Sequence, residues 1–141
     1  MAGYKTDRSV PFPRTGLSVG IAIYNFLLDR GLPAYPVVAM PSANGVQLQL
    51  PYVVYSLAGV TTRADKTLPG PRSVTVVLTC YGSGYDEALE VAEVANNMLS
   101  HRFEDAEFEG MVVRGIQLEN ASDGYDGDAY YFALTYRILT N

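Results

Sequence analysis

The chain contains few of the residues on which metal and thiol chemistry depend. Its 141 residues include one cysteine, Cys80, one histidine, His101, and no tryptophan. A single cysteine cannot close an intramolecular disulfide, and a single histidine leaves a zinc site without the second imidazole that many such sites use. We therefore expect no structural disulfide, no metal and no cofactor. We also find no paired base and nucleophile, so we do not expect an enzyme.

Long apolar runs and an excess of positive charge are also missing. The longest apolar candidate, residues 17–28, is interrupted by Ser18, Gly20 and Asn25, and a transmembrane helix needs about 18 or more apolar residues. Residues 1–16 have no apolar core, so we expect no signal peptide and synthesis in a cytoplasm. The net charge of −5 is opposite in sign to most nucleic-acid-binding domains. Neither a membrane nor sequence-specific nucleic acid is an expected partner.

The charges are divided unequally along the chain. Residues 1–85 carry seven basic and three acidic residues, whereas residues 86–141 carry three basic and twelve acidic residues. If folding keeps these halves on different faces, copies of the chain attract one another head to tail, and such contacts close into a ring or grow into a filament. If folding interleaves the halves, no charged patch survives.

The pattern of apolar residues predicts one domain, residues 16–141, preceded by a flexible arm, residues 1–15, that contains two prolines. The apolar positions in residues 17–28 fall at helical spacing, and Gly31 follows where a left-handed terminator belongs. The apolar stripe of residues 85–100 gives the clearest helix, with its acidic residues off the stripe.

The remaining elements are predicted to be strands. Runs that alternate or are rich in β-branched residues indicate four strands, and an Asn-Gly pair favours a hairpin. The order of elements lacks a regular βαβ alternation, so we expect an α+β fold with a mostly antiparallel sheet packed against two helices. The predicted strands are residues 52–57, 73–81, 111–119 and 130–138, and the hairpin joins residues 35–40 and 46–50.

A long basic segment is the first candidate contact region. Residues 59–72 are predicted to be a loop, and a loop of this length in a compact domain is usually functional or disordered. Together with the arm it holds six of the ten basic residues, and we expect neighbouring molecules to order both segments. The interface residues expected from it are Arg63, Asp65, Lys66 and Arg72.

The second candidate contact region combines tyrosines with two groups of acidic residues, one on the second predicted helix and one in SDGYDGD, residues 122–128. The latter does not match a calcium-binding loop, because the twelfth residue counted from Asp123 is Leu134 rather than glutamate. We interpret it as a glycine-bearing turn and the acidic residues of the second helix as a solvated face. Eleven tyrosines are present, and tyrosine is enriched at protein interfaces. The expected contact residues are Asp86, Glu90, Glu93, Tyr125, Asp126 and Asp128.

Four segments of the chain resemble one known family. They are LPYVVY at residues 50–55, a strand ending in Tyr81-Gly82, the helix YDEALEVAEVANNML, and FEGMVVRGIQLENASDGYDGDAYYFALTYRI. In order and type they are similar to the tail terminator, or tail completion, family of long-tailed bacteriophages. The resemblance covers residues 17–138.

The resemblance implies a structural role in the virion. Members of the family form hexameric rings on the head-proximal end of the tail tube, stop tube polymerisation and dock to the neck. The implied partners are further copies of the chain, the tail tube protein and a neck or head-completion protein. The implied location is the tail and neck of the virion, after assembly in the host cytoplasm.

Two alternatives stay open. The chain could be another neck ring or a tail-tube subunit, in which case it would polymerise rather than close into one ring. It could instead be a small-ligand or peptide-binding module outside viruses, because a fold does not fix a function. That alternative predicts a monomer with a concave apolar pocket.

Overall fold

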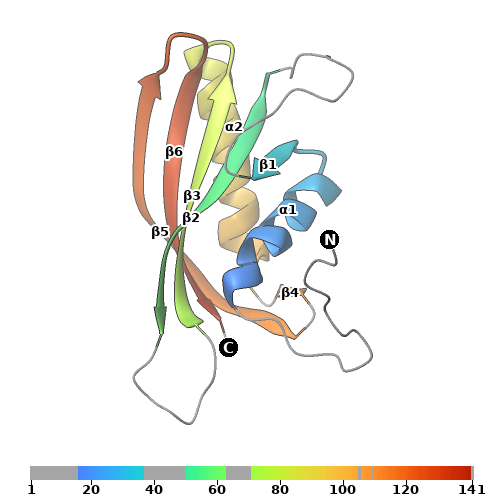
Figure 1. The fold of residues 1–141 in the computed structure, drawn as a ribbon. Helices are drawn as coiled ribbons and strands as arrows, with labels where there is room; N and C mark the ends of the chain where they lie inside the picture. Colours follow the sequence, from blue (N-terminus) through green and yellow to red (C-terminus); the bar gives the residue numbers. More distant parts are fainter. Residues whose placement is uncertain (1–15, 37–49, 63–70, 105, 109, 141) are drawn as a thin grey trace, which may run out of the picture.

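The described residues fold as one six-stranded sheet with helices α1 and α2 on the same face (Figure 1). The computed structural model describes residues 16–36, 50–62, 71–104, 106–108 and 110–140. The strand order is β1-β2-β3-β6-β5-β4, and all pairs except β1 with β2 are antiparallel. The α+β prediction is therefore confirmed. The elements are η1 Gly16–Ser18, α1 Val19–Asp29, β1 Ala34–Pro36, β2 Tyr52–Thr62, β3 Pro71–Gly82, α2 Tyr85–Arg102, β4 Glu107–Phe108, β5 Met111–Tyr125 and β6 Tyr130–Thr140.

The core lies between the sheet and helix α2, as the two apolar patterns predicted. Along β3 the buried residues alternate strictly, which places one face of the strand against the helices. The predicted stripe of α2 is buried on the other side of this interface. These residues are Val74, Val76, Leu78 and Cys80 of β3 and Ala88, Val91, Ala92, Ala95 and Leu99 of α2.

Burial makes Cys80 an inert thiol. Its side chain is fully buried, and desolvation raises the pKa of the thiol to about 12. The reactive thiolate is then about 1,000-fold rarer near neutral pH than in an ordinary cysteine. We expect a thiol reagent such as iodoacetamide to modify Cys80 only after denaturation, as mass spectrometry would show. Modification of the native chain at the rate of free cysteine would contradict the buried placement.

Helix α2 sits so close to β3 that Gly82 has no room for a side chain. A Cβ at this position would lie 2.4 Å from the backbone nitrogen of Ala88 and 2.9 Å from its Cα. Since the obstacle is backbone, Gly82→Ala should destabilise the fold by about 1 to 3 kcal/mol or more, measured by thermal or urea unfolding. Gly59→Ala is the matched control, because a Cβ there has nothing within 4 Å. Equal stability of the two variants would contradict this packing.

Helix α1 is confirmed, but its buried stripe differs from the predicted one. The apolar positions at helical spacing are Leu17, Ile21, Tyr24 and Leu28. Tyr24 packs against the core, whereas Leu17, Ile21 and Leu28 are 61%, 44% and 49% exposed. The helix is apolar on almost every side, so the spacing alone did not fix which side packs. Gly31 ends the helix with a positive φ of 80°, as predicted. The residues that pack are Val19, Ala22, Ile23, Phe26 and Leu27.

Two strands extend into segments that were predicted to be irregular. Residues 59–62 and 71–72 are strand and not loop, because the β-branched residues of 60–62 continue the pairing of β2 with β3. Register shifts between Leu57 and Gly59 and between Thr61 and Thr62 interrupt this pairing. Strand β5 likewise continues to Tyr125, so Asp123 lies in a strand and pairs with Phe132 rather than lying in the turn.

Several predicted features fall outside the described residues. Residues 1–15, 37–49 and 63–70 are among these, so the arm, the domain boundary and most of the Asn-Gly hairpin stay predictions. Of the hairpin's ends, Tyr35 and Pro36 lie in β1, which runs parallel to β2.

Candidate interaction surface

The end of the β5–β6 hairpin carries a group of acidic and aromatic side chains, which we call the acidic aromatic end. It comprises Tyr85, Asp86, Asp123, Tyr125, Asp126, Asp128 and Tyr130, all of them exposed. Tyr85, in the first turn of α2, donates a hydrogen bond from its hydroxyl to Asp123 Oδ2 at 2.7 Å. This bond and the charges of Asp123 and Asp86 raise the pKa of Tyr85. Helix and hairpin are thus joined at this end (Figure 1).

At this end the exposed ring of Tyr130 contacts two other exposed rings. The ring centroids of Tyr125 and Tyr130 are 4.8 Å apart, and those of Tyr85 and Tyr130 are 6.2 Å apart with the rings nearly perpendicular. Tyr125 is 59% exposed although its hydroxyl donates to the Gly127 carbonyl at 3.1 Å. Rings fixed in place yet open to water suit an interface, because little side-chain entropy is lost on contact.

The turn between β5 and β6 is closed by one carboxylate. Asp126 Oδ1 accepts hydrogen bonds from the backbone N–H groups of Asp128 and Ala129, both at 2.9 Å. Gly127 has a φ of 99°, which a side chain would make unfavourable. The backbone hydrogen bonds lower the pKa of Asp126, since they stabilise its charged form. The predicted glycine-bearing turn is therefore present, confined to residues 126–129.

The charge of Asp126 should make the turn sensitive to acid. A lowered pKa in the folded state means that its stabilising effect is present at pH values above the ordinary value of 3.8 and is lost as the pH falls through the folded-state pKa. We expect Asp126→Ala to lower stability by about 1 kcal/mol at pH 7, as loss of a capping side chain does. Asp126→Asn keeps a hydrogen-bond acceptor but lacks the charge. In urea unfolding experiments its loss of unfolding free energy relative to the native chain should shrink as the pH falls below 3.8. A deficit that grows on acidification would refute this role.

The face of the sheet that is turned away from the two helices carries a row of tyrosines. Tyr52, Tyr81 and Tyr131 are aligned across β2, β3 and β6, with centroid distances of 5.2 and 5.9 Å. Tyr35 of β1 extends the row at 5.8 Å from Tyr52. Burial and the charge of Asp126 raise the pKa values of Tyr52 and Tyr81, so these hydroxyls stay neutral at physiological pH. Part of the tyrosine content therefore belongs to sheet packing.

The side chains of six of the ten predicted contact residues lie in the described part of the chain. Asp86, Tyr125, Asp126 and Asp128 belong to the acidic aromatic end, and Glu90 and Glu93 follow along the exposed side of α2. Arg63, Asp65 and Lys66 lie outside the described residues, as does the side chain of Arg72 in β3. The strand ends that flank this basic segment, Thr62 and Pro71, lie at the end of the sheet opposite the β5–β6 turn (Figure 1).

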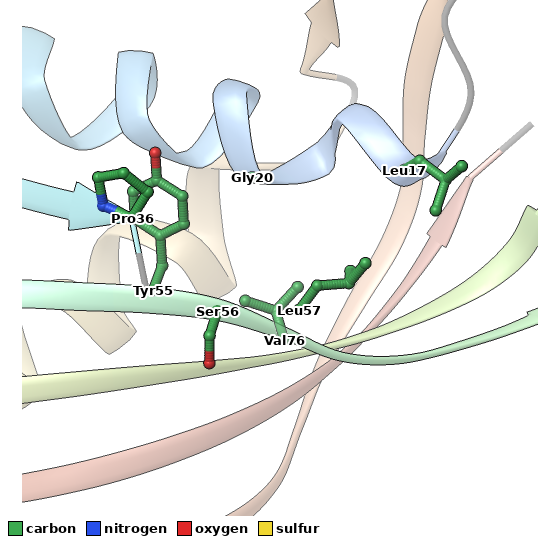
Figure 2. Close-up of a pocket in the computed structure, with 7 residues that line it drawn as sticks. All are labelled: Leu17, Gly20, Pro36, Tyr55, Ser56, Leu57 and Val76. Carbon is green, nitrogen blue, oxygen red and sulfur yellow. The ribbon is translucent and has the colours of Figure 1, made fainter. Parts of the chain in front are cut away.

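An apolar groove, which the sequence did not predict, lies between α1 and β2. Its volume is about 170 Å³. Figure 2 shows Leu57 and Val76 rising from the sheet toward the helix, with Leu17 at one end and Tyr55 beside Pro36 at the other. Gly20 lets the helix approach, since a Cβ there would lie 3.2 Å from the Tyr55 ring. The sequence indicated this groove only in that α1 has more apolar residues than one packing face requires.

Comparison with known proteins adds no further assignment. The sequence matches no protein-family model and no curated protein. Within the described residues, no three His, Cys, Asp or Glu side chains are grouped as metal ligands would be. No helix in the described part of the chain is long and apolar enough to cross a membrane.

Proposed function

We propose that the protein is a ring-forming structural subunit of a bacteriophage tail, placed at the head-proximal end of the tail tube, where it ends tube polymerisation and joins the tail to the neck. The observations that carry the proposal are the exposed acidic aromatic end of the sheet and the unequal division of charge along the sequence. The acidic aromatic end lies opposite the strand ends that flank the basic segment 63–70. A chain with complementary ends favours heterologous contacts between copies, and such contacts generate rings.

The exposed aromatic residues can contribute the binding free energy that surface charges do not. A surface ion pair contributes only about 0 to 1 kcal/mol, so charge can orient two copies but cannot hold them together. Tyr85, Tyr125 and Tyr130 provide exposed apolar area at the acidic aromatic end, and Leu17 and Leu57 provide it beside the apolar groove. This combination supports an assembling subunit.

The same features also fit the nearest alternatives. Another neck ring or a tail-tube subunit would use similar contacts, and differs in whether the assembly closes or continues. A small-ligand module draws support only from the apolar groove. Ligand pockets usually measure about 300 to 1,000 Å³, and the groove of about 170 Å³ is smaller. We therefore favour the structural subunit over a binding module.

The test is a tube-capping experiment. Purified protein is added to polymerising tail tube subunits from the same phage, and tube lengths are measured by electron microscopy. A terminator should bind one end of each tube and arrest growth at substoichiometric ratios. Co-polymerisation along the tube would favour a tube subunit instead. A protein that stays monomeric and leaves tube length unchanged would refute both structural functions.

A further inference from the structure

Two tyrosines form the last pair of residues before the turn of the β5–β6 hairpin. Tyr125 and Tyr130 are partners in the register of the two strands. Directly opposite residues on antiparallel strands place their side chains on the same face, close enough to interact. The ring centroids are 4.8 Å apart, and the rings are inclined to each other by 45°. The hairpin thus brings two phenol groups together at its end.

Hydrogen bonds of the turn hold this pair in place. The Tyr125 hydroxyl donates to the Gly127 carbonyl at 3.1 Å, which fixes the direction of its ring. The Asp126 N–H donates to the Ala129 carbonyl at 3.2 Å, and the Asp126 carboxylate accepts two backbone N–H groups of the same turn. Groups that are already held together need little reorganisation before they react with each other.

Both rings are open to a dissolved oxidant. Tyr125 is 59% exposed and Tyr130 is 37% exposed. The carboxylates of the acidic aromatic end surround them, and a surface of negative charge attracts cationic reagents. Cysteine and tryptophan are the usual competitors for such oxidants, but the chain has no tryptophan and its one cysteine, Cys80, is fully buried. Oxidation is therefore directed to the exposed phenols.

We propose that Tyr125 and Tyr130 are an oxidative crosslinking site, which a one-electron oxidant converts to dityrosine within a single copy of the chain. Each phenol gives one electron to the oxidant and its hydroxyl proton to water. The two phenoxyl radicals then form a carbon–carbon bond between the ring carbons next to the hydroxyls. The hydrogen atoms of these two carbons move to the oxygens and restore both hydroxyls, so two electrons and two protons leave in total.

The arrangement of the two rings fits this product. Directly bonded aromatic rings are twisted between coplanar and perpendicular, because the atoms beside the bond clash in a flat arrangement, and the observed angle of 45° is of this kind. Tyr85 also contacts Tyr130, but at 6.2 Å and nearly perpendicular. Its hydroxyl is moreover held by Asp123 at 2.7 Å. Tyr125 is therefore the better placed partner for Tyr130.

The row of tyrosines on the other face of the sheet is less suited to the reaction. Its ring centroids are 5.2 Å apart between Tyr52 and Tyr81, and 5.9 Å apart between Tyr81 and Tyr131. These side chains are half-buried, whereas Tyr125 and Tyr130 are exposed. Among these pairs we therefore expect the hairpin pair to be crosslinked first.

Brief photo-oxidation of the full chain tests the site. The oxidant is tris(bipyridine)ruthenium(II), activated by light in the presence of persulfate, and the protein is dilute enough to be monomeric. Trypsin cleaves after Arg114 and Arg137, so both tyrosines lie in one peptide, residues 115–137. We expect this peptide to lose the mass of two hydrogen atoms and to show dityrosine fluorescence. Its mass spectrum should lack fragments from backbone cleavage between residues 125 and 130, because the new bond closes a ring there.

Two matched variants show which ring takes part. Tyr125→Phe should lower the yield of crosslinked peptide at least about tenfold, because phenylalanine has no hydroxyl and forms no phenoxyl radical. Tyr85→Phe removes the hydroxyl of the other ring that contacts Tyr130 and should leave the yield within about twofold of the native chain. Equal loss in both variants, a link between Tyr52 and Tyr81 instead, or oxidation without any link would overturn the proposal. The reaction takes place within one copy, so its failure would leave the proposed ring intact.

Discussion

Purified protein is expected to run in multi-angle light scattering as a closed assembly of about six times the 15.4 kDa chain mass, and reversing two acidic charges at one end should convert it to monomer. Asp86 and Asp128 are exposed members of the acidic aromatic end whose side chains accept no hydrogen bond described in the structure. Asp86→Lys/Asp128→Lys replaces attraction to the basic segment of the next copy with repulsion. We expect the assembly to weaken by at least about 100-fold.

The control for this prediction carries the same change in net charge at two exposed acidic residues that are not predicted contact residues. Asp29→Lys/Glu104→Lys alters the last residue of α1 and a residue that follows α2. It should leave the mass of the assembly unchanged at physiological salt. Equal loss of assembly in both variants would point to net charge rather than to the acidic aromatic end. A native chain that is monomeric at high concentration, at low and at high salt, would contradict the ring itself.

Strand β3 and helix α2 could be predicted from the sequence because each has one clear pattern of apolar and polar residues. In β3 the buried residues alternate without exception, and in α2 the acidic residues leave a single apolar stripe. Helix α1 lacks that contrast, so its packing face could not be chosen from spacing. Leu17 and Ile21 are both exposed, and Leu17 lines the apolar groove. Only tertiary packing shows which apolar residues of this segment stay exposed.

The limits of the strands depended on long-range pairing. Residues 59–62 and 120–125 contain glycine, serine, aspartate and asparagine, which favour turns, yet each segment pairs with a strong neighbouring strand. The row from Tyr131 to Gly124 illustrates the cause. A Cβ on Gly124 would lie 2.5 Å from the ring carbon that bears the Tyr131 hydroxyl, so the glycine makes room for the tyrosine of the partner strand. A glycine on one strand that leaves space for a large side chain on the next cannot be recognised from the sequence of either strand alone.

The assembled protein is expected to bind duplex DNA no more tightly than a neutral protein does at physiological salt. A ring at the joint between head and tail must let the genome pass, and duplex affinity rises with each phosphate that a lysine or arginine neutralises. Acidic residues outnumber basic ones by 15 to 10, and the described acids Asp86, Glu90, Glu93, Asp123, Asp126 and Asp128 are all exposed. We propose that some of them face the lumen or the neighbouring subunit.

Fluorescence titration of labelled duplex at physiological salt and at about 50 mM salt measures this directly. We expect no saturable binding below about 10 μM protein at the higher salt, since non-specific complexes of DNA-binding proteins already fall in the range of about 1 to 100 μM. Removal of the arm, residues 1–15, takes away Lys5, Arg8 and Arg14 and supplies the control for weak binding by that segment alone. Sub-micromolar binding that survives physiological salt would contradict a passive channel and would instead assign the basic segments to nucleic-acid recognition.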